Sequence, residues 1–244
     1  MGSMIGAFIG DSLGSFVEFE IGDCPNEILD KAMSMPGGGI WELKPGQVTD
    51  DSELAMCQLR GLLAGGGQFD HFHHALYYGS WINSKPFDIG NTTKNGLGPL
   101  ATCLERPNPD LAYEAARSGR GASSMSTGSM MRITPLAVWS RNLSTTDIEE
   151  CVRLDVSMMH SRMDMWDLCS AYCIAIKTLI NNANNTNRAK LAIDAVREYS
   201  ERDMRSYLVA KWLDLAKSLV KKVREKEEET GEQNLFGNFV YNVY

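Results

Sequence analysis

Apolar residues recur every three or four positions along much of the chain, the spacing that one face of an amphipathic helix requires. The pattern is strongest after Ser144, where polar residues precede each apolar run. It predicts long helices over residues 50–64, 68–83, 148–159, 164–180, 188–200 and 204–228. Four shorter helices are also expected. One lies between Pro25 and Met35, one starts at Thr92 or Thr93, one ends at about Ser118, and one runs through Arg132 to about Trp139. Because no stretch alternates as a strand would, we expect an all-α fold, in a single domain over residues 1–244.

Glycines recur every fourth residue near the start of the chain, at Gly2, Gly6, Gly10 and Gly14. On a helix they would share one face, where a neighbouring backbone can approach closely. Each glycine weakens a helix by about 1 kcal/mol relative to alanine. Either close packing offsets this cost, or the segment is not helical throughout.

Composition and charge exclude several classes of protein. With 43% hydrophobic and 23% charged residues, the 244-residue chain is globular rather than disordered. The net charge of -7 argues against binding to nucleic acid. No apolar run is long enough for a membrane helix, and no signal peptide is apparent. The six cysteines lack Cys-x-x-Cys spacing, so we expect free thiols and a location in the cytoplasm or the nucleus.

The segment Gly46–Glu53 places three oxygen-bearing side chains, Thr49, Asp50 and Asp51, just before an apolar run. Adjacent acids repel each other, so they need a cation, a solvated surface or a helix N-terminus. Thr49 could equally cap a helix whose dipole the two acids complement. The residues alone leave both alternatives open, as they do for Glu18, which is either a surface acid or part of a site.

Two further clusters also have two interpretations. The small-residue loop 119–131 contains Ser126-Thr127-Gly128-Ser129 and runs into a predicted helix, so it is either a phosphate cradle or a flexible linker. His71, His73 and His74 are closely spaced, but no cluster of acids follows them. We therefore expect these three histidines at the surface rather than on a metal.

Five segments in order resemble the ADP-ribosylglycohydrolase family. They are Gly6–Glu18, Gly46–Glu53, the stretch from Trp81 through Pro86–Thr93, Ser126–Leu136, and His160-Ser161 before a long helix. The resemblance implies a compact all-α fold with two Mg²⁺ or Mn²⁺ ions in a cleft between helices. It also implies that Thr49, Asp50 and Asp51 are metal ligands, and that Asp51 and Glu18 are catalytic. By the same resemblance Asp88, Ser126, Thr127, Gly128, Ser129 and His160 bind the substrate.

This sequence departs from the family pattern at two places. Thr127 stands where the family commonly has Asn, which alters one hydrogen bond expected to the ligand. Nothing after Asp203 resembles the family's second metal cluster, Asp-x-Asp-Thr, so that segment is expected to lie beyond Tyr244. Without it, each metal would lack about half of its protein ligands.

The resemblance implies a hydrolase that removes ADP-ribose from a protein side chain or a related conjugate, at the anomeric carbon of the ribose. Its partner would be the ADP-ribosylated protein, with no nucleic acid and no membrane. The missing cluster supports an alternative, a catalytically inactive relative or fragment that binds ADP-ribose or is structural, as crystallins are. The linkage that is hydrolysed and the oligomeric state stay open.

Overall fold

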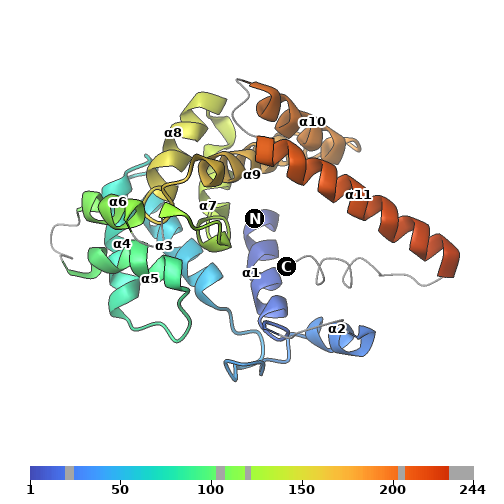
Figure 1. The fold of residues 1–244 in the computed structure, drawn as a ribbon, viewed down its shortest axis with the longest axis horizontal. Coiled ribbons are helices and arrows are strands. Elements are labelled where there is room, and N and C mark those ends of the chain that lie inside the picture. Colours follow the sequence, from blue (N-terminus) through green and yellow to red (C-terminus); the bar gives the residue numbers. More distant parts are fainter. Residues whose placement is uncertain (20–24, 103–107, 119–121, 203–206, 231–244) are drawn as a thin grey trace.

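The computed structural model describes residues 1–19, 25–102, 108–118, 122–202 and 207–230. The described residues form helices and turns, with one isolated β-bridge between Gly38 and Leu43. The predicted all-α fold is therefore confirmed (Figure 1). None of the described helices is both long and apolar enough to cross a membrane.

The helices follow one another with short connections. In chain order they are α1 (Gly2–Gly14), α2 (Asn26–Ala32), α3 (Asp50–Ala64), α4 (His71–Asn83), α5 (Asn91–Leu97), η1 (Gly98–Thr102), α6 (Pro109–Arg117), η3 (Thr127–Ser129), α7 (Thr134–Trp139), η4 (Ser140–Asn142), α8 (Thr145–Val156), α9 (Met163–Asn181), α10 (Arg188–Glu201) and α11 (Tyr207–Thr230).

The helices pack around two hydrophobic cores. One core lies among α7 to α11 and includes Leu136, Val152 and Cys173. The other lies among α3 to α6 and includes Leu54 and Tyr78. Figure 1 shows α1 beside both groups, while α11 begins against α9 and α10 and its far end extends away from the other helices.

A buried polar network lies between the two cores. The guanidinium of Arg132 donates to the carboxylate of Asp155 on α8 and to the hydroxyl of Tyr78 on α4, and all three side chains are buried. His74 Nδ1 and the Tyr78 hydroxyl each lie 2.9 Å from Asp155 Oδ1. Burial alone would raise the pKa of Asp155, but the Arg132 charge and the His74 hydrogen bond hold it well below its usual range.

Most predicted helices lie near their predicted bounds, and α3 matches its own at both ends. Two of the predicted helix bounds were wrong. The helix expected to run through Arg132 begins only at Thr134, because Pro135 suits a first helical turn and Arg132 is drawn inward to Asp155. The helix expected to reach Met159 ends at Val156, and a turn carries the chain on to His160.

The structure also tests three smaller expectations. The surface location predicted for His74 was wrong, because Asp155 partners its ring in the interior. Cys57, Cys169 and Cys173 are buried free thiols as expected, whereas Cys24 and Cys103 lie outside the described residues. Helix α1 is helical from Gly2 to Gly14, yet a Cβ at any of its four glycines would meet no atom of the described residues within 4 Å. The glycine stretch is thus helical, and none of the described residues packs closely against its glycine face.

Candidate active site

Asp11 joins α1 to the N-terminus of α3. Its carboxylate accepts hydrogen bonds from the backbone N–H groups of Thr49 (3.0 Å) and Ser52 (3.1 Å). It also accepts from both hydroxyls, Thr49 Oγ1 at 2.7 Å and Ser52 Oγ at 2.5 Å. Thr49 occupies the N-cap position, but its own side chain makes no capping hydrogen bond. The cap of α3 is thus supplied by an acid 38 residues earlier, which also fixes the Thr49 hydroxyl.

A cavity of about 550 Å³ opens beside this junction. Its polar and charged lining comes from Asp11, Ser15, Glu18, Thr49, Asp51, Thr127, Thr134 and Tyr172, with Ala7, Gly10, Gly14, Met130 and Met131 completing the wall. Two glycines of α1, Gly10 and Gly14, therefore form part of the wall. Four segments that are distant in the sequence meet here, and a space of this size suits a small organic ligand.

Acids crowd one side of the cavity. Burial first, and then the charges of Asp88, Asp51 and Glu18, raise the pKa of Asp50 to about 8. Burial, followed by the charges of Asp11 and Glu18, raises the pKa of Asp51 to about 6. Asp50 does not line the cavity and is 8% exposed. The site thus concentrates negative charge that a proton or a cation would stabilise.

Two aromatic side chains border the acids. The indole N–H of Trp41 donates to Glu18 Oε2 at 3.0 Å. The Trp41 ring meets Phe87 edge to face, with centroids 6.1 Å apart. Next to Phe87, burial and the charges of Glu18 and Asp11 raise the pKa of Asp88 to about 6. Asp88 thus lies within electrostatic reach of the cavity, although it does not line it.

His160 supports the small-residue loop from behind. Its Nδ1 lies 2.8 Å from Ser129 Oγ, and its Nε2 lies 3.2 Å from Ser126 Oγ. Gly128 packs so closely that a Cβ there would lie 2.8 Å from Met159 Cε. Burial, and then the Arg132 charge, lower the pKa of His160 to about 4, so the ring is neutral at pH 7. Of the four residues Ser126–Ser129, Thr127 lines the cavity and the other three do not.

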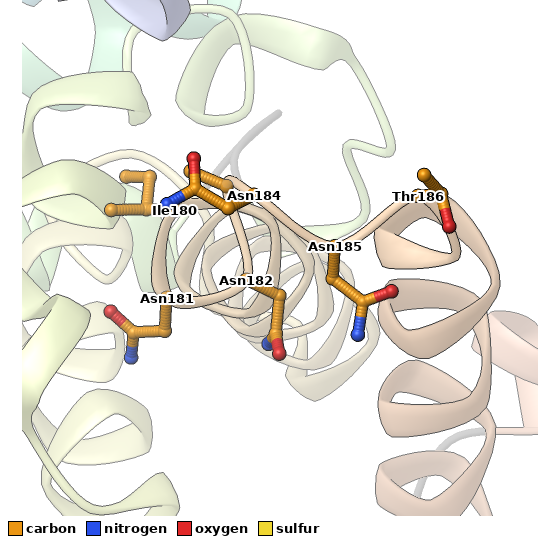
Figure 2. Close-up of a pocket in the computed structure, with 7 residues that line it drawn as sticks. Ile180, Asn181, Asn182, Asn184, Asn185 and Thr186 are labelled. Carbon is orange, nitrogen blue, oxygen red and sulfur yellow. The ribbon is translucent and has the colours of Figure 1, made fainter.

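A second hollow, of about 630 Å³, lies at the turn between α9 and α10. Figure 2 shows the amides of Asn181, Asn182 and Asn185 pointing outward from this turn rather than towards a common point. The lining contains no acidic or basic side chain, and its one hydroxyl, on Thr186, has no base in the lining to activate it. It therefore lacks the groups that acid–base or covalent chemistry needs.

Comparison with known proteins places the chain in a family. The model of the family described as ADP-ribosylglycohydrolase matches residues 1–244. The chain belongs to the ADP-ribosylglycohydrolase family. A solved chain titled "ADP-ribosylglycohydrolase-related protein complex" has a similar fold, with a TM-score of 0.55 and 22% identity over 84% of this chain and 76% of that one.

Several curated members of the family are similar over part of their length. L543 of Acanthamoeba polyphaga mimivirus, provisionally named an ADP-ribosyl glycohydrolase, is 32% identical over 194 residues, 76% of this chain and 56% of L543. The ADP-ribosyl-[dinitrogen reductase] glycohydrolase of Rhodospirillum rubrum is 28% identical, over 75% of this chain and 56% of its own. ADP-ribosylarginine hydrolase Tri1 of Pseudomonas putida (strain GB-1) is 26% identical, over 80% and 50%. The chain spans about half the length of these relatives.

The donors that the family resemblance assigns to a metal are present on α3. Thr49, Asp50 and Asp51 offer hydroxyl and carboxylate oxygens, the ligands that Mg²⁺ prefers, and the raised pKa values mark uncompensated negative charge. Thr49 Oγ1 and Asp51 Oδ2 lie 3.5 Å apart. In the described part of the chain, no three His, Cys, Asp or Glu side chains are already grouped to hold an ion. The chemistry of the donors thus fits a divalent cation, although a closed acidic cage is not preformed.

The structure brings some of the predicted site residues together and sets others apart. Glu18, Thr49, Asp51 and Thr127 line one cavity. The remaining predicted residues lie beside or behind it: Asp50, Asp88, Ser126, Gly128, Ser129 and His160. The sequence interpretation missed Asp11, Trp41 and Tyr172. For Asp11 a signal existed, since it is an acid in the middle of an otherwise apolar, glycine-rich segment.

Proposed function

We propose that the chain hydrolyses conjugates of ADP-ribose, releasing free ADP-ribose from a modified protein side chain. The observation that supports this most directly is the cavity where Glu18, Asp51 and Thr49 meet the Thr127 loop in a member of this family. The named activities of the R. rubrum and P. putida relatives concern ADP-ribosylated dinitrogen reductase and ADP-ribosylarginine. A conjugate of this kind is the substrate class that we propose.

In this proposal the bond between the anomeric carbon and the side chain breaks, and a water oxygen bonds to that carbon. Asp51, whose carboxylate lines the cavity, is the group that we assign to accept a proton from the water. Glu18, on the same cavity, is the second group able to carry a proton. Glu18 gives one proton to the departing side chain while Asp51 takes one from the water, so the overall reaction consumes one water and the charge balances.

Binding of the substrate is assigned to the loop and to the neighbouring acid. We assign the ribose and phosphates to Ser126–Ser129, where Thr127 faces the cavity and His160 fixes the backbone through Ser126 and Ser129. Asp88 is assigned to a ribose hydroxyl. As a cofactor we propose two Mg²⁺ or Mn²⁺ ions, with Thr49, Asp50 and Asp51 among their ligands. When bound, such ions would supply positive charge that favours ionised substrate groups and acidifies water.

The test measures the release of ADP-ribose from arginine-linked and serine-linked ADP-ribosyl peptides by chromatography. The reactions contain Mg²⁺, Mn²⁺ or EDTA. We expect release with a divalent ion, and a loss of at least about 100-fold with EDTA or with Asp51→Asn. Asn181→Ala, at the hollow between α9 and α10, is the matched control and should act as wild type. Failure to release ADP-ribose from either peptide with either ion would refute the proposal.

The absence of a preformed acidic cage among the described residues favours one second candidate, an ADP-ribose-binding protein without hydrolytic activity. Calorimetry with ADP-ribose separates the two candidates. Binding that is unaffected by EDTA, together with no release from either peptide, would establish the second.

A further inference from the structure

Trp41 is held at the tip of a tight, unusual loop. The backbone groups of Gly38 and Leu43 pair on either side of it, with N–H···O distances of 2.7 and 2.9 Å. At the base of the loop, the Gly46 N–H donates to the Met35 carbonyl at 3.1 Å. Glu42, directly after Trp41, has φ at 51°, a value that non-glycine residues rarely adopt.

The loop also fits tightly against the end of α1. Gly37 and Gly39 both have positive φ, at 70° and 68°. A Cβ on Gly39 would lie 2.6 Å from the Ser15 carbonyl oxygen, and one on Gly37 would lie 2.3 Å from the Leu43 carbonyl oxygen. No side chain fits at either position, so the backbone path depends on glycine. Strained backbone of this kind persists where the surrounding structure holds it, and it clusters at functional sites.

The conformation of this loop produces one specific contact. The loop delivers the Trp41 indole N–H to Glu18 Oε2 at 3.0 Å, on an acid that lines the cavity. The same ring meets Phe87, which is directly followed by Asp88. One side chain thus contacts the proposed proton carrier and the segment that bears the proposed ribose acid.

We propose that Trp41 is a positioning residue that fixes the orientation of the Glu18 carboxylate at the cavity. Hydrogen bonds to a charged group are directional and stronger than neutral ones, so the indole selects one rotamer of Glu18. Through Phe87, the indole also keeps the loop that ends at Gly46 against the loop that carries Asp88. This inference rests on the proposed function, because positioning matters only if Glu18 takes part in the reaction.

The matched control is another tryptophan in the same fold. The Trp81 indole donates to Glu53 Oε2 at 2.7 Å, but neither residue lines the cavity. Trp41→Phe and Trp81→Phe therefore remove the same kind of hydrogen bond, while each keeps an aromatic ring. Only the first should affect the reaction.

Kinetics give the first readout. Trp41→Phe should lower kcat for ADP-ribose release by about 10-fold to 100-fold and leave KM within about twofold, because it disorders an acid used in the transition state. In a Glu18→Gln background, Trp41→Phe should have no additional effect. Trp81→Phe should retain the wild-type kcat. The inference would be overturned if Trp41→Phe lowered kcat by the same factor in the Glu18→Gln background as in wild type. It would also be overturned if Trp81→Phe lowered kcat by that factor.

A second readout does not depend on activity. The chain has five tryptophans, so a ¹⁵N spectrum contains five indole N–H signals, and the Trp41 signal is the one that Trp41→Phe removes. Glu18→Gln should shift that signal and leave the Trp81 signal in place. An unshifted Trp41 signal would overturn the inference. If wild type releases no ADP-ribose, the proposed function fails, and the indole signal alone decides whether Trp41 fixes Glu18.

Discussion

At the scale of single residues, His160 carries a pH dependence that can be measured. Its pKa in the folded protein is about 4, below the ordinary value of 6.5, because the ring is buried near Arg132. Between these two values the unfolded chain binds more protons than the folded one, so stability falls as the pH is lowered through this window. The free energy of unfolding should fall by about 3 kcal/mol in total, because each unit of pKa difference corresponds to about 1.4 kcal/mol.

The prediction is tested by urea unfolding of wild type and His160→Gln between pH 7.5 and 4. The raised pKa values of Asp50, Asp51 and Asp88 act in the opposite direction, since stability is lost as the pH rises through them. These acids are present in both proteins, so their contribution cancels in the difference. Wild type should lose about 3 kcal/mol relative to His160→Gln over this range, and a constant difference would contradict the assignment.

Part of the site was predictable because its residues are adjacent in the sequence. Thr49, Asp50 and Asp51 are consecutive, and their charge density alone raised the possibility of a cation or a helix end. The partner that settles their local structure, Asp11, is 38 residues away from Thr49, and only the packing of α1 against α3 brings it there. The same limit applies to Trp41, whose role depends on a contact with Glu18 across 23 residues.

At the scale of elements, two helical glycines should respond in opposite ways to alanine. A Cβ on Gly61 of α3 would lie 2.3 Å from the Cδ2 atom of His74, where α3 crosses α4. Gly61→Ala should therefore destabilise the protein by about 1 to 3 kcal/mol through overpacking. A Cβ on Gly6 of α1 would meet no atom of the described residues within 4 Å, so Gly6→Ala should stabilise α1 by about 0.5 to 1 kcal/mol.

Thermal unfolding of the two variants beside wild type provides the measurement. Opposite shifts in Tm are expected, and a loss of stability in both would mean that the α1 face is not open. Helix existence was predictable from apolar spacing, as for α3 and α9, whereas ends set by tertiary contacts were not. The start of α7 depends on Arg132 turning inward, which no local pattern encodes.

At the scale of the whole molecule, the Arg132 network joins the two hydrophobic cores. Arg132 precedes α7 and Asp155 lies on α8, two helices that contribute to the first core. His74 and Tyr78 lie on α4, and Tyr78 belongs to the second core. Burying these charges is costly, and the cost is offset only while both partners are present. Helical spacing predicts where each core lies, but it does not predict that a fully buried ion pair connects them.

Removing one partner should therefore destabilise the entire fold. Arg132→Met keeps a long apolar side chain but leaves the Asp155 carboxylate buried beside His74 and Tyr78 alone, so we expect a loss of about 3 to 5 kcal/mol. The control is Glu150→Gln, which breaks the exposed Glu150–Arg153 pair of 2.6 Å on the same helix and should cost under about 1 kcal/mol. Urea unfolding measures both variants, and similar losses in the two would show that the buried pair does not connect the cores energetically.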